Sequence, residues 1–200
     1  MHFKNKVSIF RNLKQSNMKK IIIGSLVGAI LLFAWQSLSW TVLGVHNRAF
    51  KHTPAQEAIL SALSTNLTEE GQYLVPRLPE SASHKEVEES MKKNEGKPWA
   101  IVTYHKEHKT DMVMPIIIGF LVCFVCVWLC CRVIARIVNR SFFEVFLTTL
   151  SFGVVCFLFV WYMGHNWMHT PWDVLKGELI DDVVGWGLTG VWLGWWYGRK

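Results

Sequence analysis

Cysteine is absent from residues 46–111 of this chain, which form its longest polar segment. A small exported domain held together by disulfide bonds is therefore excluded in this segment. Acidic residues are absent from the first 20 residues, which carry six lysines and arginines. The cysteines all lie inside two long apolar runs, at Cys123, Cys126, Cys130, Cys131 and Cys156.

Runs of about 18 or more apolar residues predict helices that cross a membrane. Four such runs are present, at 20–45, 112–134, 142–163 and 178–198. The last is the weakest, because its charge-free part, Val183 to Gly198, would reach only about 24 Å across a hydrocarbon core about 30 Å thick. It therefore spans only if it begins near Glu178. The sequence predicts a mainly α-helical membrane protein with a four-helix transmembrane bundle.

Basic residues mark the ends of these runs that we expect to face the cytoplasm. They fill the N-terminal tail 1–19, recur in the link 135–141 and close the chain, whereas the loop 164–177 has only Lys176. The positive-inside rule therefore places both termini and the 135–141 link in the cytoplasm, and residues 46–111 and 164–177 outside. Topology accounts for the net charge of +6, so nucleic-acid binding is not predicted.

The segment 46–111 carries the signals of a small α/β domain. A cap at Thr53-Pro54 predicts a helix that stops near Asn66, and the capping box Ser83 to Glu86 predicts a second helix through about Asn94. Residues 72–75 and 99–104 are typical of short strands. Because so few residues make a marginal core, we expect this extracytoplasmic domain to lean on the membrane helices or on a partner.

Glycines at four-residue spacing mark two of the predicted spans. Small residues at this spacing let helix backbones approach closely in lipid. The two sets lie at the same predicted depth, so we expect them to pack together, or to serve an oligomer or a membrane-protein partner. They are Gly24 and Gly28 in the first span and Gly190, Gly194 and Gly198 in the last.

Histidines and acids gather at the outer ends of the predicted spans. Imidazole and carboxylate groups suit Zn²⁺ and other divalent metals, so one hypothesis is an outward-facing metal or proton site. His165 and His169 would share a face if their helix continued that far. The alternative is that these are polar side chains of the kind that commonly lie among lipid headgroups, since no diagnostic metal-site spacing is present. The candidate residues are His46, His165, His169, Asp181 and Asp182.

Asp181 and Asp182 admit two interpretations. Acids in the first turns of a helix complement its macrodipole, and we favour this interpretation. Alternatively, a buried acid at this depth exchanges protons. Pairing with His165 or His169, to hold the last span against the third, is compatible with both.

Enzyme chemistry has little support. The Cys123-Phe-Val-Cys126 motif is typical of thiol redox or metal sites, but loop cysteines for a relay are missing, so packing between helices is favoured. No histidine lies in mid-span, which disfavours haem, and no serine has a nucleophile signature. We predict that the chain is not an enzyme and needs no cofactor, apart from the metal hypothesis above.

Several motifs together resemble a family of small uncharacterised bacterial four-span inner-membrane proteins. They are Trp35-x-x-Leu-Ser-Trp40, His46-Asn47, Gly71-x-Tyr73-x-x-Pro76 and Asp182-x-x-Gly185-Trp186. The family often has a Pro-Trp-His triplet where this chain has Gly44-Val45-His46. The resemblance implies a bacterial inner-membrane location and this topology, and it transfers no activity. The sequence thus predicts a non-enzymatic accessory, assembly or oligomeric component, with metal- or proton-linked transport or sensing as the alternative.

Overall fold

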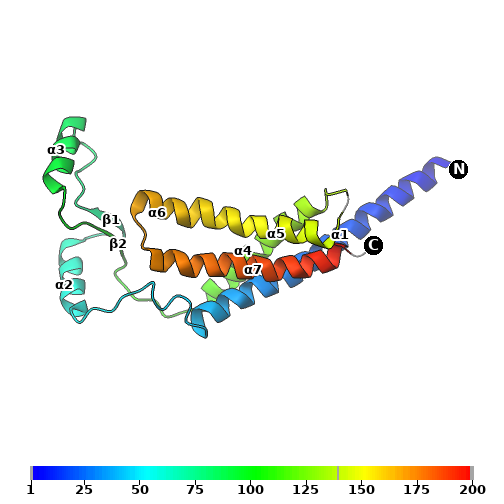
Figure 1. Cartoon of the computed structure of the whole chain (residues 1–200), viewed down its shortest axis with the longest axis horizontal. Helices are drawn as coiled ribbons and strands as arrows, with labels where there is room; N and C mark the ends of the chain where they lie inside the picture. Colours follow the sequence, from blue (N-terminus) through cyan, green and yellow to red (C-terminus); the bar gives the residue numbers. More distant parts are fainter. Residues whose placement is uncertain (1, 139, 199–200) are drawn as a thin grey trace. The chain divides into compact units, whose positions relative to one another are not determined.

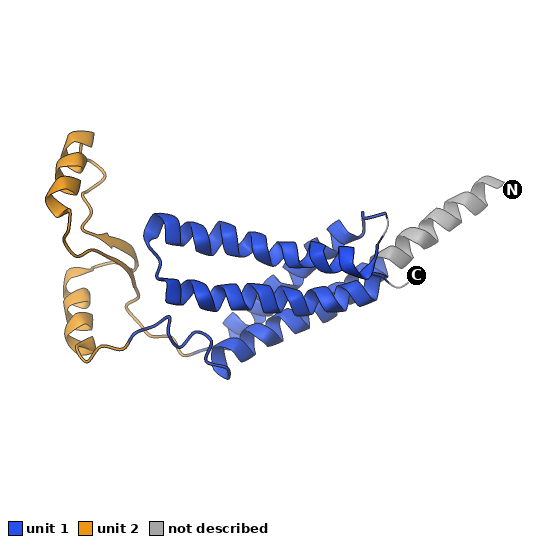
Figure 2. Cartoon of the chain, viewed as in Figure 1, with its two compact units in different colours: residues 1–51, 111–200 blue, residues 52–110 orange. Residues whose placement is uncertain are grey.

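The computed structural model describes residues 18–138 and 140–198 in full, and residues 2–17 by the course of the backbone alone. The predicted tail 1–19 therefore lies mostly outside the residues whose side chains are described. The chain divides into two compact units, one formed by Met1–Lys51 with Asp111–Lys200 and the other by His52–Thr110 (Figure 2). We call them the helical unit and the small unit.

The helical unit consists of long helices that pack against one another (Figure 1). Helix α7 packs against both α5 and α1, and α4 packs against α1 and α5. A π-helical segment, η1, joins α5 to α6 without a break. The elements are α1 (His2–Thr41), α4 (Val113–Ile134), α5 (Phe142–Cys156), η1 (Phe157–Tyr162), α6 (Met163–Met168) and α7 (Trp172–Gly198).

Three stretches of helix in the described residues are long and apolar enough to cross a membrane: Met18–Thr41, Val113–Ile134 and Phe142–Met168. The prediction of a mainly helical chain with membrane-length apolar helices is therefore confirmed, whereas the fourth span stays a prediction. Helix α7 is less apolar because it carries acids, glycines and tryptophans. It also begins at Trp172, earlier than expected, because Pro171 starts its first turn and accepts the amide hydrogens of Val174 and Leu175.

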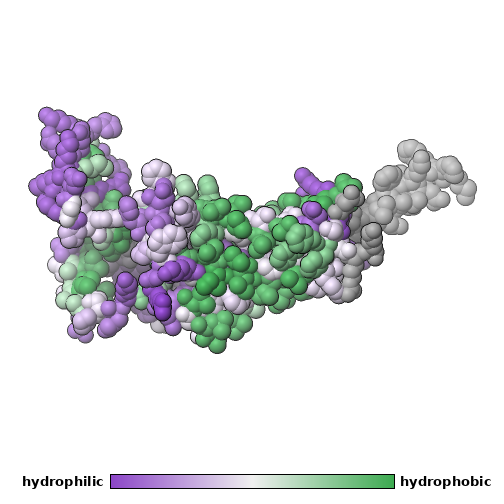
Figure 3. Space-filling model, viewed as in Figure 1, coloured by the Kyte–Doolittle hydropathy of each residue, from purple (hydrophilic) through white to green (hydrophobic). Residues whose placement is uncertain are grey.

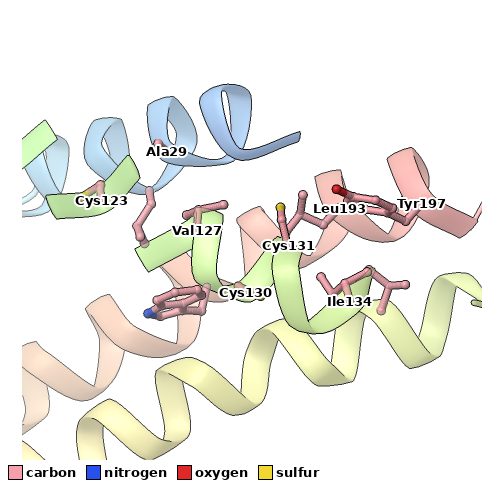
Figure 4. Packing of buried hydrophobic residues seen from close by; sticks show 11 residues of the cluster. Ala29, Cys123, Val127, Cys130, Cys131, Ile134, Leu193 and Tyr197 are labelled. Atoms are coloured by element: carbon pink, nitrogen blue, oxygen red, sulfur yellow. The ribbon is translucent and has the colours of Figure 1, made fainter. Parts of the chain in front are cut away.

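The core of the helical unit is built where α1, α4, α5 and α7 meet (Figure 4). Cys130 and Cys131 are fully buried in it, and Cys123 is nearly so. The described cysteines are free thiols. In the motif predicted to pack between helices, Cys123 is buried in this core and Cys126 packs against it partly buried. Apolar side chains cover much of the outer surface of this unit as well, as lipid contact requires (Figure 3).

The small unit contains helices α2 (Gln56–Asn66) and α3 (His84–Asn94) and the antiparallel strands β1 (Gly71–Val75) and β2 (Ala100–Tyr104). Both hydrogen bonds of the predicted capping box join Ser83 and Glu86. The predicted cap at Thr53 is wrong, because α2 begins three residues later and the Thr53 hydroxyl accepts the amide hydrogen of Ala55 instead. Tyr104 alone is buried among the residues of this unit that the structure describes.

Candidate functional site

The carboxylate of Asp181, in the middle of α7, is the centre of a buried polar cluster. Its side chain is only 7% exposed, and three donors reach it. Oδ1 accepts hydrogen bonds from the Trp35 indole nitrogen at 3.1 Å and from the Ser39 hydroxyl at 2.5 Å. Oδ2 lies 2.9 Å from Nε2 of His46. We call Trp35, Ser39, His46 and Asp181 the polar centre.

The local sequence explains how these donors converge. Trp35 and Ser39 are four residues apart on α1 and therefore share one face of that helix. The chain then turns back at Gly44, whose positive φ of 62° a residue with a side chain rarely adopts. The turn is closed by hydrogen bonds from Val45 N–H to the Ser39 carbonyl and from Asn47 N–H to the Gly44 carbonyl. This reversal carries His46 back to the face that holds Ser39.

The imidazole of His46 is enclosed on both sides. The Trp40 indole stacks on it, with ring centroids 3.9 Å apart and planes 10° from parallel. On α7, Gly177 leaves room for it, since a Cβ at this position would lie 2.7 Å from Nδ1. Nδ1 is buried and has no hydrogen-bond partner within the described chain; Glu178 Oε1 is 3.9 Å away. The ring is therefore fixed in place with one nitrogen unused.

This geometry suits a buried ion pair. The side chains of His46 and Asp181 are 4% and 7% exposed, and a charge in such surroundings is stable only when it is paired and hydrogen-bonded. Two neutral donors and an imidazolium would together satisfy the carboxylate. Protonated His46 would also direct its free N–H toward Glu178. The cluster thus ties α1 and the turn after it to α7.

His165 and His169 do not join the polar centre. Nδ1 of His165 lies 2.7 Å from the carbonyl oxygen of Thr170, and its ring packs against Trp172 with centroids 4.8 Å apart. Helix α6 ends at Met168, and His169 adopts a left-handed conformation as its C-cap. The two histidines therefore do not share a helical face. Of the two acids predicted to pair with one of them, Asp181 contacts His46 instead.

The metal hypothesis gains no support from the side-chain positions. Within the described residues, no group of three or more His, Cys, Asp and Glu side chains is placed to hold a metal ion. His46 and Asp181 do meet, but as hydrogen-bond partners. The five residues predicted for one site are divided between the polar centre, the α6–α7 turn and the contact of α7 with α5.

The favoured interpretation of Asp181 and Asp182 as helix-start acids is also wrong. Because α7 begins at Trp172, its first turn carries Asp173, and the two later acids lie well inside the helix. Asp182 lies where α7 meets α5, and its backbone oxygen is 2.6 Å from the position of a Cβ on Gly153. Its Oδ2 is buried without a hydrogen-bond partner in the described chain.

The predicted glycines all lie at helix contacts, but the predicted pairing of the two sets is wrong. Gly190, Gly194 and Gly198 face α5, where a Cβ would approach Phe142 or Phe146 within 2.7 to 3.1 Å. On α1, Trp196 of α7 fills the space that Gly24 leaves, and Val127 of α4 with Thr189 of α7 fills the space at Gly28. The Trp192 indole donates to the Gly24 carbonyl at 3.0 Å and that of Trp196 to the Lys20 carbonyl at 2.9 Å.

Several residues of the site escaped the sequence analysis: Trp35, Ser39, Trp40, Gly177 and Glu178. Tryptophans near the end of a span are expected at the membrane interface, so the positions of Trp35 and Trp40 did not by themselves indicate a polar site. The signal that indicates Ser39 is its spacing of four from Trp35, because two hydrogen-bonding side chains on one face of an apolar helix require a polar partner.

The small unit offers a second candidate, a set of exposed apolar side chains on separate elements. Large apolar side chains on both of its helices and on its sheet are exposed. They include Leu60 on α2 (61% exposed), Val75 at the end of β1 (50%) and Met91 on α3 (71%). A two-stranded sheet with so little buried side chain is marginal by itself. We call Leu60, Val75 and Met91 the exposed apolar residues of the small unit.

Comparisons of the chain with protein-family models, curated proteins and solved structures give no match. The resemblance to a family of bacterial inner-membrane proteins therefore stays a prediction, and function is argued from the two candidate sites alone.

Proposed function

We propose that this chain is a four-span integral protein of the bacterial inner membrane, with both termini in the cytoplasm and the small unit in the periplasm. Helix α7 supplies the fourth span. Its 27 residues extend about 40 Å, more than a hydrocarbon core of about 30 Å requires. Asp181, the most buried of its acids, does not face lipid, since it is enclosed by α1 and the turn after it.

Within this membrane protein we propose a non-enzymatic accessory or assembly role, in which the small unit binds a partner protein. The observation that carries the proposal is the exposure of Leu60, Val75 and Met91, in a unit with a single buried residue among those described. Exposed apolar side chains that a domain cannot bury itself mark protein interaction sites. The glycine faces are less suitable for this role, because they are occupied within the chain.

Site-specific photo-crosslinking in the full-length chain, expressed in its membrane, tests this role. A photoreactive residue at Met91 is expected to give one discrete adduct with a second protein. The matched control is Lys85, whose exposed side chain lies on the same helix α3. Equal labelling from both positions, or none from Met91, contradicts the proposal. An adduct of twice the chain's own mass identifies the partner as a second copy.

Proton-linked sensing or transport is a second candidate, favoured by the unused Nδ1 of His46. The ionisable groups closest to this ring are Asp181 and Glu178, both on α7, while α1 contributes the neutral Ser39, Trp35 and Trp40. Imidazole can bind a proton at one nitrogen and release one from the other. A proton taken up on Nδ1 would draw Glu178 toward the ring, and a rigid α7 would carry that movement along its length.

Nitrogen NMR of the His46 ring in the full-length chain tests this candidate. We expect the chemical shifts of both ring nitrogens to change reversibly when the pH is varied over the range in which the protein stays folded, as a ring that takes up and releases protons requires. Glu178→Gln is expected to alter this change, whereas Lys176→Gln, at an exposed position on the same helix, is not. A ring that keeps one tautomer and one charge over this range contradicts the candidate.

A further inference from the structure

At the opposite end of α7 from its first turn, two cations lie at one aromatic ring. Lys20 Nζ is 5.5 Å and the Arg140 guanidinium carbon 5.9 Å from the centroid of the Tyr197 ring. The three residues come from α1, from the link between α4 and α5, and from the last turn of α7. The Tyr197 hydroxyl donates to the Lys20 carbonyl at 3.4 Å, which ties two of these elements together.

Arg140 is held in place by the end of α4. Its Nε donates to the Ile137 carbonyl at 3.0 Å and one terminal nitrogen donates to the Ala135 carbonyl at 3.3 Å. These bonds use part of the guanidinium fork and leave other N–H groups for an acceptor. The cation is therefore positioned before any ligand arrives.

The positive charge of this pair is not balanced by neighbouring acids. In the described part of the chain, no carboxylate oxygen lies within 4 Å of Lys20 or Arg140. Further cations stand nearby in sequence, at Lys19, Arg132 and Arg136, against one acid, Glu144. The ligand that complements this end of the helical unit is an anion.

Exposed apolar side chains follow both cations in the sequence. They include Ile22 and Ile23 on α1, which are 49% and 46% exposed, and Phe143 on α5, which is 62% exposed. A free anion would not contact these apolar side chains, whereas the acyl chains of a lipid would cover them. The occupant that fits both parts is a lipid with an anionic headgroup.

We propose that Lys20 and Arg140, positioned around Tyr197, bind the headgroup phosphate of an anionic phospholipid whose acyl chains lie along α1 and α5. Basic pockets between membrane helices bind acidic headgroups through such charges, each of which strengthens binding about fivefold. Arginine adds directional N–H donors to the phosphate oxygens, and lysine adds a point charge. The proposal is independent of the roles suggested for the polar centre and for the small unit.

Native mass spectrometry of the full-length chain in detergent tests this site. The protein is mixed with phosphatidylglycerol or with phosphatidylcholine of the same acyl chains, and the bound fraction of each is measured. We expect the wild type to retain phosphatidylglycerol in preference to phosphatidylcholine. The double variant Lys20→Gln, Arg140→Gln is expected to reduce that preference about 25-fold, the product of two fivefold effects. Arg132→Gln is the matched control, because Arg132 lies 5.1 Å from a different ring, that of Trp128.

The outcomes separate the site from its alternatives. An unchanged preference in the double variant overturns the proposal, and so does an equal loss in Arg132→Gln, which would indicate general surface charge. Displacement of the lipid by inorganic phosphate at the same molar concentration also overturns it in favour of a free anion. Should the double variant fold poorly, Lys20→Arg with Arg140→Lys keeps both charges, and it is expected to retain the preference for phosphatidylglycerol over phosphatidylcholine.

Discussion

His46 and Asp181 are 135 residues apart in the chain, and yet the imidazole Nε2 and the carboxylate Oδ2 lie 2.9 Å apart in a buried pair. The contact joins the turn after α1 to the middle of α7. It is the clearest sign that α7, although it carries acids, belongs inside the assembly of helices rather than beside it.

Replacing Asp181 with asparagine is expected to destabilise the helical unit by about 3 kcal/mol. Removal of one member of a buried ion pair leaves its partner without compensation, which typically costs about 3–5 kcal/mol. We place the effect at the low end, because asparagine still accepts hydrogen bonds from Ser39 and Trp35. Denaturant unfolding in detergent measures it. Asp173→Asn, at the exposed start of the same helix, is the control and should change stability by less than about 1 kcal/mol.

Gly177→Ala is expected to displace the His46 ring. The added Cβ would lie 2.7 Å from Nδ1 and 2.9 Å from Cε1, so the imidazole must shift away from Asp181. Overpacking of this kind costs about 1–3 kcal/mol. The same unfolding measurement tests it.

Gly187→Ala provides the control for this substitution on the same helix. No heavy atom lies within 4 Å of the position that its Cβ would take. Alanine in a helix is favoured over glycine by about 0.5–1 kcal/mol, so this variant should be as stable as the wild type or slightly more so. Equal destabilisation by both variants would contradict the packing that we assign to Gly177.

Trp192→Phe removes one hydrogen bond between helices while keeping most of the ring. The indole N–H donates to the Gly24 carbonyl, and such bonds between membrane helices contribute about 0.6 kcal/mol on average and up to about 2 kcal/mol. We expect a loss in this range, measured by unfolding in detergent. Trp167→Phe, at a position 68% exposed, should leave stability unchanged.

The capping box of the small unit predicts a dependence on acid pH. Hydrogen bonds from the backbone N–H and then the hydroxyl of Ser83 hold the pKa of Glu86 below its ordinary value of 4.5. A carboxylate with a lowered folded pKa stabilises the folded state above the unfolded pKa, and this contribution is lost as the pH falls through the folded value. The N-terminus of α3 should therefore begin to fray as the pH drops below about 4.5.

Amide hydrogen exchange at Glu86 and Val87 measures this fraying. In Glu86→Gln the acid-dependent part should disappear, because glutamine does not titrate. Glu89→Gln is the control on the same helix, since Glu89 lies near Lys85 and makes no bond to the cap. Fraying that persists unchanged in Glu86→Gln would contradict the assignment.

Local sequence signals predicted the helices and strands of this chain well, because such signals depend only on residues that are close in the sequence. The capping box at Ser83 and the apolar run from Val113 to Ile134 are of this kind. The start of α7 was misplaced because Asp173 and Lys176 were assigned to the polar loop 164–177. In the structure these residues form the first turns of the helix, which Pro171 initiates.

The polar centre could be predicted only in part, because its contacts depend on tertiary packing. His46 and Asp181 were candidates by residue type and by expected depth, but nothing local pairs either with a particular partner. The glycines show the same limit. Spacing predicts that Gly24 and Gly190 lie at helix contacts, and only the rotation of each helix decides that one faces tryptophans of α7 and the other Phe146 of α5.

The separation of His46 from Asp181 also sets an order for biosynthesis. At about 5–20 residues per second, roughly 7–27 s pass between the synthesis of the histidine and that of its partner. During that interval, the carboxylate that later contacts Trp35, Ser39 and His46 has not yet been synthesised. The polar centre therefore closes late in the synthesis of each chain. In a chain truncated before α7, these donors would stay without their partner and be exposed to the quality-control machinery for membrane proteins.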